Sequence, residues 1–281
     1  MDRIKIRSRS DKVLSEPQII FLSQSKTESI AKTHEVVRKC LLQRQTAFNV
    51  LLTNGEANKY ARSYKHLPFV LINRACGYIY PFVSNDYDYL RRSVRKISCQ
   101  IEYTSEYVKI FYSISYLTTL PQENQIDDYL QKLFTDHKAY EISDIYNRIR
   151  FAYDFIIAHV RYDNQIRKHS AYDALMERKA VCEGCSLLLY RMLAMFGVPC
   201  RIITGRGLRE SHAWNIISIG GKWYNADVTW DLFKGVIERK LSLYDYFLVG
   251  ESHFHQHRRD AEFMTFDFTA QHPMYEGNYV S

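Results

Sequence analysis

Cys182 is the residue whose type and position point most clearly to chemistry. It lies in the run Val-Cys-Glu-Gly-Cys at 181–185, where the chain enters an apolar segment that predicts a helix ending at Gly197-Val198-Pro199. A thiol at the start of a helix faces unpaired backbone N–H groups and the positive end of the helix dipole, and both favour the thiolate. Because an arbitrary cysteine is more often a small buried hydrophobe, the neighbouring residues must decide whether Cys182 is a nucleophile.

A predicted β-hairpin places a histidine beside a carboxylate. Residues 213–230 read as two strands joined by a two-residue turn at Gly220-Gly221. The register of this turn pairs Trp214 with Asp227 and His212 with Thr229. His212 and Asp227 are then diagonal neighbours on one face, with Cα atoms roughly 7 to 8 Å apart, a span that their side chains can close. Since an imidazole oriented by a carboxylate is the base that a nucleophilic thiol needs, Cys182, His212 and Asp227 form a candidate catalytic triad.

The sequence around these residues resembles the transglutaminase-like superfamily over about residues 143–260. The runs that carry the resemblance are Ala180–Gly184, Phe196–Pro199, Thr204-Gly205, His212–Asn215 and Trp223–Asp231, with Tyr162-Asp163 before them and Tyr246–Leu248 and His257–Asp260 after them. The resemblance implies that Cys182 is the nucleophile, His212 the base and Asp227 the carboxylate that orients it. It also implies an α+β, papain-like fold in which a helix packs on an antiparallel sheet, preceded by an N-terminal α/β region.

One residue departs from the family pattern, since Cys185 stands where members usually have an aromatic side chain. The resulting Cys-x-x-Cys is a spacing found in redox sites and in one half of many zinc sites. The chain has no second Cys-x-x-Cys, and a redox site would not explain His212 and Asp227, so we expect no metal and no cofactor. Oxidation could still join Cys185 to Cys182 as a disulfide.

Three histidines stand at alternate positions after the candidate triad: His253, His255 and His257. On a strand they would share one face and could bind a divalent metal. A solvated turn before Arg258 is the simpler interpretation, and it is the one that we expect.

A boundary near residue 136 divides the chain into two regions. Residues 1–135, to which the sequence assigns no role, carry three predicted elements: a helix over 27–52, a hairpin of alternating apolar residues over 97–116 and a helix over 126–134. Residues 136–281 form the expected catalytic core. Its first helices are predicted to start after Ser143 or Asp144 and at a capping box formed by Ser170 and Asp173.

Composition excludes several classes of protein. The 281 residues include 38 Lys+Arg and 31 Asp+Glu, a formal net charge of +7, and 46% are hydrophobic, whereas disordered chains have low hydrophobicity. The basic residues accompany no nucleic-acid-binding motif. No segment resembles a signal peptide or the ~20 apolar residues of a membrane span, and six cysteines are too few for a disulfide scaffold. We therefore expect a cytoplasmic protein with free thiols that binds neither membranes nor nucleic acid.

The predicted function is thiol acyl transfer on peptide or amide bonds of a protein or peptide substrate. The backbone N–H of Cys182 is the default oxyanion donor, and the acyl-enzyme then meets water or an amine. Because the chain shows no acidic loop spaced for calcium, metal-independent hydrolysis by a cysteine peptidase or amidase is favoured over protein-glutamine cross-linking. A non-catalytic interaction module of the same fold is the alternative from another class, and the presence of all three triad residues argues against it.

Overall fold

The computed structural model describes residues 5–6, 19–20, 30–53, 67–75, 87–104, 107–208, 210–237 and 244–280. The chain divides into two compact units, Met1–Leu120 and Pro121–Ser281. In the described ranges, no helix has a stretch that is both long and apolar enough to cross a bilayer.

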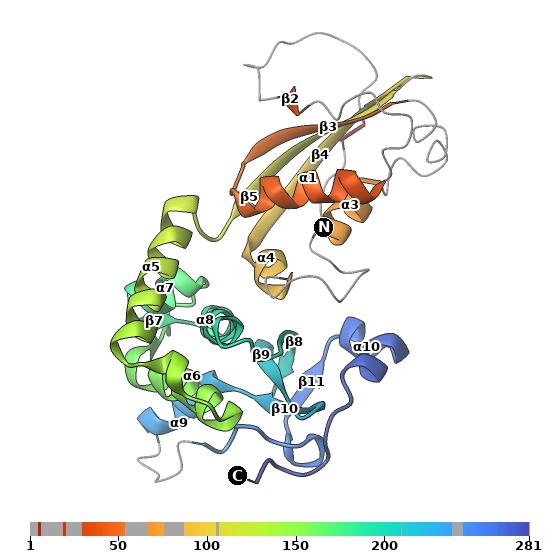
Figure 1. Cartoon of the computed structure of the whole chain (residues 1–281). Coiled ribbons are helices and arrows are strands. Elements are labelled where there is room, and N and C mark those ends of the chain that lie inside the picture. The colour runs from red at the N-terminus through yellow and green to blue at the C-terminus, as the bar shows by residue number, and fades with distance from the viewer. Residues whose placement is uncertain are drawn as a thin grey trace. The chain divides into compact units, whose positions relative to one another are not determined.

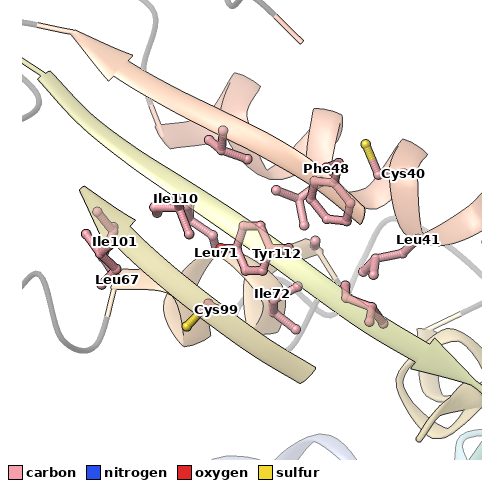
Figure 2. Close-up of a cluster of buried hydrophobic side chains, with 14 of the residues drawn as sticks. Cys40, Leu41, Phe48, Leu67, Leu71, Ile72, Cys99, Ile101, Ile110 and Tyr112 are labelled. Carbon is pink, nitrogen blue, oxygen red and sulfur yellow. The ribbon is translucent and has the colours of Figure 1, made fainter. Parts of the chain in front are cut away.

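The first unit is a five-stranded sheet with helices packed beside it (Figure 1). The strands, in their order across the sheet, are β1 (Lys5–Ile6), β4 (Val94–Tyr103), β5 (Tyr107–Tyr116), β3 (Ala47–Thr53) and β2 (Ile19–Ile20). The helices among the described residues of this unit are α1 (Ile30–Leu42), α3 (Leu67–Ala75) and α4 (Tyr87–Ser93). Figure 2 shows the core between α1, α3 and the sheet, where the rings of Phe48 and Tyr112 stack at 5.0 Å.

The hairpin predicted over residues 97–116 is confirmed, since β4 and β5 pair antiparallel. The helix predicted over 27–52 is wrong in its second half, because α1 ends at Leu42 and β3 follows it. Phe48, Val50 and Leu52 are buried at every second position, as a strand with one buried face requires. Before the strand, Arg44 adopts a left-handed conformation with φ 53°. Apolar spacing alone did not separate the helix from the strand.

The second unit packs helices on a four-stranded antiparallel sheet. The strands, in spatial order, are β10 (Lys222–Ala226), β9 (Glu210–Ile219), β8 (Cys200–Gly207) and β11 (His257–Arg259). Figure 1 shows α8 (Cys182–Met195) beside β8 and β9. The other helices are α5 (Leu120–Asp136), α6 (Ile145–His159), α7 (Ala171–Met176), α9 (Val228–Ile237) and α10 (Phe266–Gln271), and a small parallel pair joins β6 (Arg161–Tyr162) to β7 (Lys179–Ala180). The expected α+β core with a helix on an antiparallel sheet is confirmed.

Helix α5 begins the second unit, whereas the sequence boundary near residue 136 assigned it to the N-terminal region. The ring of Phe134 on α5 lies 5.7 Å from that of Phe151 on α6 and 4.5 Å from that of Phe196, which follows α8. This aromatic packing joins α5 to the helices of the second unit, and local sequence patterns carry no trace of it.

The helix ends predicted in this unit are confirmed. Asp144 caps α6 by accepting the backbone N–H of Asn147 at 2.8 Å. Ser170 and Asp173 form the expected capping box at the start of α7. After α8, Gly197 takes a positive φ of 68°, which glycine adopts without steric cost.

Candidate active site

Cys182 is the first residue of α8, as the sequence predicts. The preceding residue, Val181, makes no side-chain hydrogen bond that caps the helix, so its side chain does not satisfy the N–H groups of the first turn. Cys182 is half-buried, whereas the other described cysteines are all buried: Cys40, Cys99, Cys185 and Cys200. Cys76 lies outside the described residues.

The hairpin register is present as predicted, and it brings His212 to Asp227. β9 and β10 pair Ile219 with Lys222 and Asn215 with Ala226. The imidazole of His212 donates a hydrogen bond from Nε2 to Oδ2 of Asp227 at 2.6 Å. The expected contact between the histidine and the carboxylate is therefore made.

The second strand is shorter than predicted, because Asp227 begins a helix. Oδ1 of Asp227 accepts the backbone N–H groups of Thr229 at 3.1 Å and of Trp230 at 3.2 Å, the hydrogen bonds of an N-cap on α9. Thr229 consequently does not pair with His212, whose strand partner is Gly205 of β8. The aspartate before the apolar run 228–237 was the available signal for this helix start, and the β-hairpin interpretation overlooked it.

His212 lies between the thiol and the carboxylate. Its side chain is 8% exposed, and besides its hydrogen bond with Asp227 it interacts with the neighbouring Cys182. Since Nε2 faces Asp227, Nδ1 is the nitrogen left for the thiol. Burial alone would lower the pKa of His212, but the negative charge of Asp227, its hydrogen bond and the neighbouring Cys182 outweigh burial and raise this pKa well above 6.5.

Asp227 is the buried anion of the site. Burial alone would raise the pKa of its carboxyl group, but the charge and hydrogen bond of His212, together with a hydrogen bond from His257, hold this pKa below 3.8. The carboxylate is therefore ionised at neutral pH, the state that keeps an imidazole oriented as a base.

His257 is a site residue that the sequence did not reveal. It donates from Nε2 to Oδ2 of Asp227 at 2.9 Å, and its side chain is only 1% exposed. The solvated turn expected for the three histidines is thus wrong at His257, which lies in β11 opposite Gly207 of β8. Nothing in the alternating pattern distinguishes it from His253 and His255, which are exposed.

A glycine and an aromatic ring shape the space between the two imidazoles. A Cβ atom on Gly207 would lie 3.0 Å from the ring of His212 and 2.9 Å from that of Trp230, so a side chain at this position would displace one of them. The ring of Trp230 lies 5.4 Å from that of His212 and 4.0 Å from that of His257. Both imidazoles are therefore held in a largely apolar enclosure.

Cys185 lies one helical turn after Cys182 and is completely buried. Burial is the main reason that its pKa is raised to about 12. A buried thiol of this kind is uncharged at neutral pH and is a weak nucleophile.

The ligand atoms of His212, Asp227 and His257 lie within 4.8 Å of one another, a spacing that a metal ion could also span. Both Nε2 atoms, however, are already at hydrogen-bonding distance from the same carboxylate oxygen. A network of two N–H donors and one anion accounts for the cluster in full, and we assign no metal to it.

Residues 135–228 match the sequence profile described as "Transglutaminase-like superfamily". Two curated relatives are similar to this chain: human "Kyphoscoliosis peptidase" is 28% identical over 150 residues, and the mouse protein of the same name is 29% identical over 146 residues. The alignments cover 47% and 46% of this chain, but only 21% and 22% of the relatives. The similarity to the transglutaminase-like superfamily therefore covers residues 135–228 of this chain.

Among solved structures, a chain described as a TGase aligns with 15% sequence identity and a TM-score of 0.36, over 52% of this chain and 48% of the other.

Proposed function

We propose that this protein is a thiol acyl-transfer enzyme that acts on peptide or amide carbonyls. The observation that carries the proposal is the position of His212, which is hydrogen-bonded to Asp227 and interacts with the neighbouring Cys182. An imidazole between a carboxylate and a thiol is the arrangement of a cysteine nucleophile with its base.

In the proposed reaction, the Cys182 thiolate attacks the carbonyl carbon and forms a C–S bond. The carbonyl oxygen becomes an oxyanion, for which we propose the backbone N–H of Cys182, at the start of α8, as a donor. The His212 imidazolium gives its proton to the leaving nitrogen as the C–N bond breaks, which leaves a thioester. His212 then accepts a proton from water, the resulting hydroxide attacks the thioester, and the thiolate leaves with release of a carboxylic acid.

Hydrolysis is proposed ahead of amine transfer. Water is present at roughly 55 M, so a transferase must exclude it and bind its amine closely to gain effective molarity. The printed name of the two curated relatives, a peptidase, also favours hydrolysis, although this chain spans only about a fifth of their length. We therefore propose a cysteine peptidase or amidase with a protein or peptide substrate.

To test this function, peptides prepared by digestion of a whole proteome are incubated with the wild-type protein and, separately, with Cys182→Ala. A primary-amine probe is included, and mass spectrometry detects the products. We expect new carboxyl termini or carboxylates formed from side-chain amides, in the wild-type sample alone. Incorporation of the probe in excess of hydrolysis would favour the transamidase, and equal products from both proteins would contradict the proposal.

A further inference from the structure

His257 is a second imidazole on the Asp227 carboxylate, and the proposed catalytic steps do not use it. His212 and His257 both direct Nε2 at Oδ2 of Asp227, at 2.6 and 2.9 Å. We propose that His257 is a positioning residue, which holds the Asp227 carboxylate in place and shares its negative charge with His212. The inference rests on the proposed function, in which His212 is the base.

The hydrogen bonds of His257 indicate that it carries a positive charge. Its Nδ1 lies 3.1 Å from the backbone carbonyl oxygen of His255, and its Nε2 faces the Asp227 carboxylate. A carbonyl oxygen and an ionised carboxylate only accept hydrogen bonds, so each nitrogen must carry a hydrogen to be satisfied. A buried charge also needs a partner of opposite sign, and Asp227 supplies it.

Aromatic rings fix the orientation of this imidazole. The ring of His257 stacks on Phe254 with centroids 3.8 Å apart and lies 4.0 Å from Trp230. Rings at this distance stabilise a cation through their negative faces and prevent the imidazole from turning. Nε2 is therefore held toward Asp227.

The other groups that face Asp227 supply no competing cation in the described part of the chain. They come from three helices and are Tyr153 on α6, Cys185 on α8 and Asp231 on α9. Burial raises the pKa of Asp231 to about 7 and that of Tyr153 well above 10. Arg259, two residues after His257, pairs instead with Glu251 at 2.6 Å.

Charge sharing would suit the two opposite tasks of His212. A base that has Asp227 to itself would hold its proton tightly, yet His212 must pass that proton to the leaving nitrogen. The two ring centroids lie 5.5 Å apart, so a cationic His257 opposes protonation of His212. Loss of this charge should raise the pH at which His212 titrates by about 1 to 2 units, for an effective dielectric constant of about 20.

The test uses nuclear magnetic resonance of the 281-residue chain with isotope-labelled histidine. The two signals are assigned by their loss in His212→Gln and His257→Gln. In the wild-type protein we expect both nitrogens of His257 to be protonated at pH 7. In His257→Gln, whose amide keeps an N–H donor without the charge, we expect the His212 titration midpoint to rise by about 1 to 2 pH units.

His255→Gln is the matched control, because its exposed side chain makes the same exchange two residues away, and it should leave the midpoint of His212 unchanged. A His257 ring with one proton at pH 7, or an unchanged His212 midpoint in His257→Gln, would overturn the inference. Acylation of Cys182, measured on the same samples, reports separately on the proposed function. A wild-type protein that is not acylated but shows the expected titrations would contradict the function alone.

Discussion

At the scale of single residues, Asp227 connects the parts of the site. Its Oδ1 caps helix α9 through two backbone N–H groups, and its Oδ2 receives the two imidazoles. One side chain therefore fixes where a helix starts and how His212 is oriented. Asn can replace Asp as a cap at little cost, but it carries no charge, so this substitution separates the two roles.

The stability of the protein should depend on pH through the ion pair that His212 forms with Asp227. The pKa of His212 is raised above 6.5, so its contribution is fully present below pH 6.5 and is lost as pH rises through the raised value. The pKa of Asp227 is lowered below 3.8, so its contribution is present above pH 3.8 and is lost as pH falls through the lowered value. We expect Asp227→Asn to reduce the free energy of unfolding by about 3 kcal/mol between pH 3.8 and pH 6.5, where both contributions are present.

Urea denaturation of both proteins from pH 3 to pH 10 measures this difference. It should shrink toward both ends of the range. A difference that is the same at every pH would contradict the charge pairing and would indicate only altered packing.

Among the thiols, Cys182 should react first with iodoacetamide at neutral pH. It is half-buried at a helix N-terminus beside His212, whereas the other described cysteines are buried. Burial raises the pKa of Cys40 to about 11 and that of Cys185 to about 12. Peptide mapping after brief labelling identifies the modified residue, and Cys182→Ser should remove the signal. Faster labelling of Cys40, Cys99 or Cys200 in the folded protein would refute the assignment.

At the level of secondary structure, strand β8 has a glycine, and therefore no side chain, where it passes between the two imidazoles. Gly207→Ala would push on the rings of His212 and Trp230, since the new Cβ would lie 2.9 to 3.0 Å from them. We expect the rate of Cys182 alkylation to fall by about 100-fold, the cost of misplacing a reacting group by roughly 1 Å. Circular dichroism should show an intact fold.

Gly277→Ala is the control for this substitution, because its nearest neighbour would be a Tyr275 ring carbon at an ordinary 3.5 Å. Equal rates for the two variants would indicate that the His212 ring moves aside freely and that Gly207 does not shape the site.

The sequence predicted most of the site because its decisive contacts are local. The Gly220-Gly221 turn sets the register that brings His212 to Asp227, and α8 starts at Cys182 as the apolar pattern indicates. His257 could not be predicted, since its place depends on the pairing of β11 with β8, which are far apart in the sequence. The assignment of α5 to the second unit could not be predicted for the same reason, since it depends on aromatic packing of α5 against α6 and against Phe196.

At the scale of the whole molecule, the proposed site lies entirely in the second unit. The residues of the triad and His257 all fall within Pro121–Ser281, and this unit has its own core, which includes Ile203, Trp214 and Ile216. We expect a fragment of residues 118–281 to fold and to keep the iodoacetamide reactivity of Cys182. Alkylation rates of the fragment and the full chain measure this directly. A folded fragment with an unreactive Cys182 would show that the site depends on residues before 118.

Acylation of the protein by p-nitrophenyl acetate tests directly whether Cys182 is a nucleophile with His212 as its base, and it needs no knowledge of the natural substrate. We predict a burst of p-nitrophenol, an acetyl group on Cys182 detected by mass spectrometry, and slower turnover as water removes it. His212→Ala should abolish the burst, and Asp227→Asn should slow it by as much as about 10⁴-fold, the loss that the comparable change causes in a serine protease. Acetylation of other residues only, or a burst of equal size in His212→Ala, would contradict the account.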